Sequence, residues 1–121
     1  MKRRKTGILG ETLARDFLEK RGYVIQESNY RCPEGEIDIV ARDGDYLVFV
    51  EVRTKQSHQF GSPEESITTI KKARLIASAY HYQQNHENLP ASWRIDFLAV
   101  ELDSTGKPYR MELFENAVTE P

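Results

Sequence analysis

The sequence predicts an α/β (α+β mixed) domain in which a single central mixed β-sheet is flanked by helices, in the order αβββαββ. Three observations carry this prediction. A stretch of helical period lies near the N-terminus, two apolar runs rich in β-branched residues follow at 37–41 and 47–52, and a helix-start signal at Ser62-Pro63 precedes two further strand-like runs. The 121 residues suffice for one core and not for two, so residues 1–121 are expected to form one domain.

The first predicted element is an amphipathic helix from about residue 6 to residue 21. Its apolar residues Leu9, Leu13 and Phe17 recur at i, i+4 and i+8, which places them on one helix face. Residues 1–5 precede this pattern with a run of basic side chains and are expected to form a flexible basic tip.

A hairpin forms the middle of the predicted sheet. A short strand at residues 23–28 and a turn-rich connection at 29–35 lead into it. The two apolar runs are its strands, and Asp43-Gly44 between them is a strong hairpin signal because both turn positions tolerate positive φ.

The second half of the chain begins with a polar loop at residues 56–62. Ser62-Pro63 then predicts a helix N-cap and first turn, and Thr68 offers a second cap, so the helix is expected to break near Thr68. One face of this helix, which continues to about residue 85, is formed by Ile70, Ala73, Ala77 and Tyr80.

Two further strands are expected, at residues 93–100 and, after a turn, at 111–114. Arg94 and Asp96 share one face of the earlier strand because side chains alternate along it. We interpret them as an ion pair that anchors the strand, in preference to a direct role in chemistry.

The composition is that of a soluble globular protein, with 30% charged and 39% hydrophobic residues and a net charge of −2. No apolar run approaches the roughly 20 residues of a membrane span, so no membrane partner is expected. The single cysteine, Cys32, excludes an intramolecular disulfide, and we expect the protein in the cytoplasm. Cys32 is interpreted as a bystander, and His81 and His86, five residues apart, as surface residues.

Acidic residues interrupt both strands of the hairpin, where such residues are depleted. Asp38 lies in the first strand, and Glu51 lies in the second, two residues before Arg53. A two-residue Gly44-Asp45 loop would place Asp38 directly opposite Glu51, an Asp43-Gly44 loop would make them diagonal neighbours, and an odd loop would separate them. Two carboxylates at that distance repel each other unless a proton or cation lies between them. The pattern therefore predicts a divalent-metal site beside a cation.

This pattern resembles that of the metal-dependent PD-(D/E)XK phosphodiesterase superfamily. The sequence at residues 35–40 and 49–52 is similar in particular to that of the small bacterial YraN-like proteins, which resemble archaeal-type Holliday-junction resolvases. The resemblance covers nearly the whole chain and implies a restriction-endonuclease-like core. One departure concerns the basic residues, because the family usually has Lys two residues after the acid and Arg two residues later, whereas Arg53 and Lys55 have exchanged these places.

The resemblance implies a metal-dependent endonuclease that uses Mg²⁺ or Mn²⁺. Its metal ligands would be Asp38, Glu51 and, from the first turn of the N-terminal helix, Glu11, with Gly10 allowing the helix to approach the sheet closely. An acid near a helix N-terminus is also favoured by the helix dipole alone, so Glu11 keeps two interpretations. The predicted catalytic residues are Asp38, Glu51, Arg53, Glu11 and Lys55.

Lys71, Lys72 and Arg74 begin the second helix and are the predicted nucleic-acid contacts, although a charge run on a helix is also typical of a solvated face. The implied partner is nucleic acid, DNA rather than RNA, and the analogy with resolvases implies a homodimer. Two other functions stay open. One is a nucleic-acid-binding protein that keeps the nuclease scaffold with weak or no cleavage, and the other is a scaffold protein whose acids serve only structural ion pairs.

Overall fold

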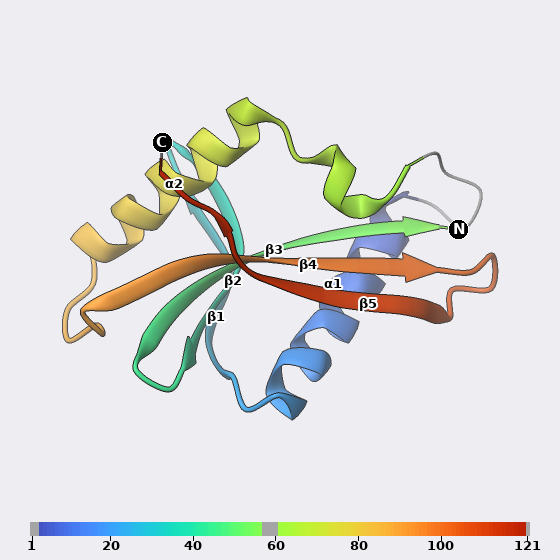
Figure 1. Cartoon of the computed structure of the whole chain (residues 1–121), viewed down its shortest axis with the longest axis horizontal. Coiled ribbons are helices and arrows are strands. Elements are labelled where there is room, and N and C mark those ends of the chain that lie inside the picture. Colours follow the sequence, from blue (N-terminus) through green and yellow to red (C-terminus); the bar gives the residue numbers. More distant parts are fainter. Residues whose placement is uncertain (1–2, 57–60, 121) are drawn as a thin grey trace.

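The computed structural model describes residues 3–56 and 61–120 and confirms the predicted class and element order (Figure 1). Residues 57–60 of the predicted polar loop lie outside this range. The elements are α1 (Arg3–Lys20), β1 (Val24–Cys32), β2 (Gly35–Asp43), β3 (Tyr46–Gln56), the 3-10 helix η1 (Pro63–Ser66), α2 (Thr69–Gln84), β4 (Ser92–Leu102) and β5 (Pro108–Val118).

The five strands form one mixed sheet in the order β1-β2-β3-β4-β5. Neighbouring strands are antiparallel except β3 and β4, which are parallel and are joined by the crossover that contains α2. The helices α1 and α2 pack on opposite faces, each over its own cluster of buried apolar side chains (Figure 1). The sheet is thereby a scaffold buried on both sides.

Several predicted boundaries were too short. Helix α1 begins at Arg3, so residues 3–5 belong to the helix and not to a flexible tip, while residues 1–2 lie outside the described part. Strand β1 continues to Cys32, and only residues 33–34 separate it from β2, because the polar residues predicted as a connection are paired with β2 across the sheet. Both β4 and β5 are likewise longer than predicted.

The break before α2 is confirmed. Thr68 caps α2 with its side chain, which accepts a hydrogen bond from the backbone N–H of Lys71, whereas Ser62 makes no side-chain cap bond. The prediction of which face of α2 is buried was wrong. Ile70 is 66% exposed and Tyr80 40% exposed. Another stripe of the same period is buried against the sheet instead, formed by Leu75, Ser78, Ala79 and Tyr82.

Gly10 brings α1 into direct contact with β3, as the resemblance predicted. A Cβ atom on Gly10 would lie 1.9 Å from Oγ1 and 2.8 Å from Cβ of Thr54. The position of the Thr54 Cβ atom does not depend on the rotamer of the side chain, so a rotamer change cannot make room for a Cβ on Gly10. The contact fixes the distance between the sheet and the part of α1 that carries Glu11. Because α1 begins at Arg3, Glu11 lies well inside the helix and not in its first turn, contrary to the prediction.

Gly10→Ala is therefore expected to destabilise the protein by about 2–3 kcal/mol, since a well-packed contact would be overfilled. Gly7→Ala is the matched control on the same helix, because a Cβ there meets nothing within 4 Å. It should stabilise the protein by about 0.5–1 kcal/mol through helix propensity. Urea unfolding measures both changes, and equal effects of the two substitutions would contradict the close contact.

Arg94 and Asp96 form the predicted ion pair, with Nε of the arginine 3.0 Å from Oδ1 of the aspartate. Within the described residues, no helix has the length and apolar character needed to cross a membrane.

Candidate functional site

The hairpin between β2 and β3 has the loop that sets the two acids opposite each other. Asp43 pairs with Tyr46, so Gly44-Asp45 is the two-residue loop. Counting back along both strands from this pair, Asp38 is the position that faces Glu51. The first of the predicted alternatives is therefore the correct one.

Strand β2 separates from β3 just before the acid. The last pair between the two strands is Ile39 with Val50, although β2 stays paired with β1 beyond that point. Ile37 and Ile39 pack in the clusters on opposite faces of the sheet, so the regular alternation of side chains is broken at Asp38. Its carboxylate Oδ2 accepts a hydrogen bond of 2.8 Å from the backbone N–H of Val52. The Asp38 side chain thus accepts a hydrogen bond from a backbone N–H of β3 that lies beyond the last residue pair between β2 and β3.

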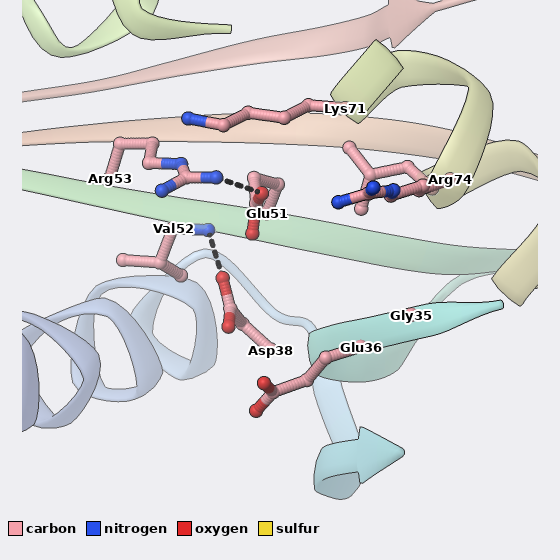
Figure 2. A pocket seen from close by; sticks show the side chains of 9 residues that line it. Gly35, Glu36, Asp38, Glu51, Val52, Arg53, Lys71 and Arg74 are labelled. Carbon is pink, nitrogen blue, oxygen red and sulfur yellow. Dashed lines mark hydrogen bonds and ion pairs between the residues drawn. The ribbon is translucent and has the colours of Figure 1, made fainter. Parts of the chain in front are cut away.

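A cavity of about 310 Å³ opens where the strands part. Asp38 and Glu36 lie on the β2 side, Glu51 and Arg53 lie on β3, and α2 contributes the opposite wall (Figure 2). Lys71 and Arg74 are the basic residues of that wall. Acids thus face cations across a space large enough for a small ligand.

Burial makes the acids interact strongly. Glu51 is only 8% exposed, and its Oε2 lies 3.0 Å from Nη2 of Arg53. Burial first, and then the facing carboxylate of Glu51, raise the pKa of Asp38 to about 8. The backbone N–H of Val52 and the charge of Arg53 act in the opposite direction but do not offset this. The pair therefore favours a proton or a cation between its oxygens.

Glu11 lies in a neighbouring cavity of about 260 Å³, which shares Glu36 and Asp38 with the first. Its Oε1 accepts a hydrogen bond of 2.8 Å from Nδ2 of Asn29. Burial raises the pKa of Glu11, although the hydrogen bond from Asn29 opposes the rise. Asp38, Glu51 and Glu11 do not all lie within 4.8 Å of one another. The first two acids are thus brought together, and the third lies to one side.

Only some of the basic residues predicted for the site line the cavity. Lys71 and Arg74 line the cavity, and Nζ of Lys71 also donates to the backbone oxygen of Ser66 at 3.3 Å. Lys72, the next residue on α2, is exposed and lines neither cavity at the acids. Lys55 shares the face of Arg53, but it does not line the cavity, and its Nζ lies beside Gly61.

The sequence of this region also matches known proteins. Residues 10–100 match the family described as Uncharacterised protein family UPF0102. The chain belongs to this family. A UPF0102 protein of Dehalococcoides mccartyi is 52% identical over 120 residues, which cover 98% of this chain and 96% of the relative. UPF0102 proteins of Moorella thermoacetica and Chloroflexus aurantiacus are 44% and 49% identical over 117 and 100 residues, covering 97% and 81% of this chain and 98% and 80% of the relatives.

The donor set of this UPF0102 site suits a hard divalent cation. Asp38 and Glu51 offer only oxygen atoms, and among the described residues Arg53 forms an ion pair with Glu51 but none is formed with Asp38. Mg²⁺ and Mn²⁺ prefer one or two carboxylates with other positions left for water or phosphate. The two residues present therefore fit such an ion.

Sequence reasoning missed three contributors to the site. Gly35 and Glu36 line the cavity because β2 leaves β3, and the backbone of Val52 binds Asp38 for the same reason. The parting of two strands depends on packing against both helices, and no local signal in the UPF0102 sequence encodes it.

Proposed function

We propose that this UPF0102 chain is a metal-dependent nucleic-acid phosphodiesterase of the PD-(D/E)XK type, with an endonuclease-like activity on branched or structured DNA. The observation that carries the proposal is the cavity in which Asp38 and Glu51 face each other while Arg53, Lys71 and Arg74 line the same space. Paired acids beside converging cations suit a phosphate bound next to a metal ion. The restriction-endonuclease-like core implied by the resemblance supports the same assignment.

In this proposal Asp38 and Glu51 hold Mg²⁺ or Mn²⁺. The ion, when bound, polarises the phosphoryl oxygens and activates water. Arg53 and Lys71 contact the phosphate and stabilise the negative charge that develops on it. Glu11, from the neighbouring cavity, holds water or a further ion rather than joining the same three-acid set.

Because residue 53 is an arginine and not a lysine, its role in the proposed reaction is restricted. A guanidinium keeps its proton at any accessible pH and therefore cannot act as a base. Its Nε is buried and has no hydrogen-bond partner among the described residues, so it is a donor that a bound ligand could satisfy. Arg53 thus orients and neutralises phosphate. Lys55, on the same strand face, is the remaining candidate for a lysine role.

A second function has one observation in its favour. The ion pair of 3.0 Å between Arg53 and Glu51 already neutralises one of the two acids. If that pair persisted, the site would bind nucleic acid through its basic wall and cleave weakly or not at all. This is the binding protein on a nuclease scaffold that the exchanged basic residues predict.

Cleavage assays distinguish the two functions. Duplex, flapped and four-way-junction DNA, with RNA counterparts, are incubated with protein and Mg²⁺ or Mn²⁺. The proposal predicts metal-dependent cleavage of branched DNA, lost by more than about a hundredfold in Asp38→Ala with Glu51→Ala, because the metal ligands are gone. If the native protein shifts these substrates in a gel but leaves them uncut, while Arg53→Lys cleaves them, the binding function is the correct one.

Two adjacent lysines test the basic wall. Lys71→Ala is expected to weaken binding of the junction by about tenfold, because Lys71 lines the cavity beside the acids. Lys72→Ala removes the same charge one residue away, outside the cavity, and should weaken binding no more than twofold. Gel-shift titration at fixed salt measures both. Equal losses would indicate a diffuse charge effect in place of a phosphate contact.

The analogy with resolvases extends the proposal to a homodimer in which two copies cut two strands symmetrically. Sedimentation of the protein alone and with junction DNA tests it.

A further inference from the structure

A second cluster of ligand-type side chains lies at the tip of the β1–β2 hairpin. Sγ of Cys32, a carboxylate oxygen of Glu34 and a ring nitrogen of His81 all lie within 4.8 Å of one another. Among the described residues, it is the only group of three or more His, Cys, Asp or Glu side chains whose ligand atoms all lie this close together. We propose that these three residues bind Zn²⁺ at a site separate from the cavity of Asp38 and Glu51.

The donor chemistry favours zinc over the hard cations. Zn²⁺ binds thiolate, imidazole and carboxylate, and three protein ligands with an open position are typical of its sites that keep a water. Mg²⁺ and Mn²⁺ prefer oxygen alone. Cys32 and His81 are half-buried, and Glu34 is exposed at the turn, so the cluster is reachable from solvent. The two metal sites of the molecule would thus select different ions.

The surroundings hold the imidazole in place. The hydroxyl of Tyr30 lies 2.6 Å from Nδ1 of His81, and Nδ2 of Asn85 donates to the backbone oxygen of His81 at 2.8 Å. Metal-binding histidines almost always make such an outer contact, which orients the ring and fixes its tautomer. Tyr30 is accordingly a positioning residue.

A zinc ion here would link two elements that lie far apart in the sequence. Cys32 and Glu34 belong to the β1–β2 hairpin, whereas His81 lies in the last part of α2. The residues that follow the hairpin tip, Gly35 and Glu36, line the cavity of the candidate functional site, and α2 supplies its basic wall. Binding releases the thiol proton of Cys32 to solvent. The site would therefore stabilise both walls of that cavity, whatever reaction the cavity supports.

The experiment uses the full chain, metal-free and reduced with a phosphine, and titrates it with CoCl₂ as a spectroscopic substitute for zinc. The expected result is a thiolate-to-cobalt charge-transfer band that reaches its maximum with one equivalent of Co²⁺ bound to the thiolate site per chain and that ZnCl₂ removes by displacement. Cys32→Ser should abolish the band, and Glu34→Gln and His81→Gln should each weaken binding by about tenfold or more. Tyr30→Phe should weaken it by about tenfold, as other outer-contact losses do.

Matched variants separate this site from other binding. His86→Gln changes the other histidine of the same region and should leave cobalt affinity unchanged, and Asp38→Asn should leave the charge-transfer band unchanged. ZnCl₂ at a hundred times its Kd should raise the Tm of the native chain by about 5 °C or more, and not that of Cys32→Ser. Circular dichroism confirms that each metal-free variant is folded. Absence of the band in the native chain at tenfold excess Co²⁺, or a band that His81→Gln leaves unchanged, would overturn the proposal.

Discussion

Replacing Asp38 by Asn is expected to make the metal-free protein more stable at pH 8.5 while removing its response to Mn²⁺. The carboxylate is held against Glu51 in a buried setting that raises its pKa to about 8, chiefly through burial. An amide of the same shape carries no charge there, and its oxygen can still accept the hydrogen bond from Val52. The gain is expected to be on the order of 2 kcal/mol, since each unit of pKa shift corresponds to about 1.4 kcal/mol and the site is partly solvated.

The pH dependence has a definite sign. The folded-state pKa of Asp38 lies above the ordinary value of 3.8, so the folded protein holds a proton that the unfolded chain has released. The stability that this proton contributes is complete below the unfolded pKa and is lost as pH rises through about 8. The Tm of metal-free native protein should therefore fall between pH 5 and pH 8.5 by several degrees more than that of Asp38→Asn.

Thermal unfolding with and without MnCl₂ measures both effects. Mn²⁺ should raise the Tm of the native protein more at pH 8 than at pH 6, because protons compete with the ion for the same oxygens. Glu36→Gln is the matched control, since Glu36 is an exposed acid on the same cavity. It should keep the native pH profile and most of the metal response. A profile for Asp38→Asn identical to that of the native protein would show that the two carboxylates do not interact.

The hairpin shows how far local sequence rules reach. Side-chain parity and a Gly-containing turn limited the loop to a few alternatives, and one of them set Asp38 opposite Glu51. Which loop forms depends on how β3 packs in the sheet, so the sequence left the alternatives open. The close approach at Gly10 was also predictable in kind, although the atom that demands it, Thr54, lies in another element.

The predictions that failed concern contacts between distant segments. On α2 two apolar stripes have the same period, and only the sheet selects the one that contains Leu75 and Tyr82. His81 and His86 were expected at the surface, but both are half-buried around Tyr30. The fold also brings His81 beside Cys32, which has no histidine near it in the sequence. Glu11 lines a neighbouring cavity that Asp38 also lines, so its role as a metal ligand stays a prediction. Each failure reflects tertiary packing that no local pattern records.

Asp96→Ala is expected to be the most destabilising single substitution, costing about 3–5 kcal/mol. Asp96 is fully buried and accepts three hydrogen bonds: from the hydroxyl of Tyr23 at 2.9 Å, from Nε of Arg94 at 3.0 Å and from the backbone N–H of Asn116 at 2.9 Å. Removing the carboxylate leaves these donors without their acceptor and leaves the guanidinium of Arg94, only 11% exposed, with Asp43 as its remaining acid partner. Since the free energy of unfolding of such domains is only about 5–15 kcal/mol, the substitution would remove a large part of the stability of the protein.

A matched ion pair of similar length isolates the effect of burial. Glu112 lies 2.7 Å from Arg110 but is 52% exposed, so Glu112→Gln should cost no more than about 1 kcal/mol. Urea unfolding at pH 7 measures both, and Asp96→Asn, which keeps the shape and one acceptor, serves if Asp96→Ala does not fold. Folded Asp96→Asn should retain the native affinity for Mn²⁺, because Asp96 lines neither of the cavities at Asp38. Lost metal affinity in a fully folded variant would contradict the role of Asp96 as a strand anchor alone.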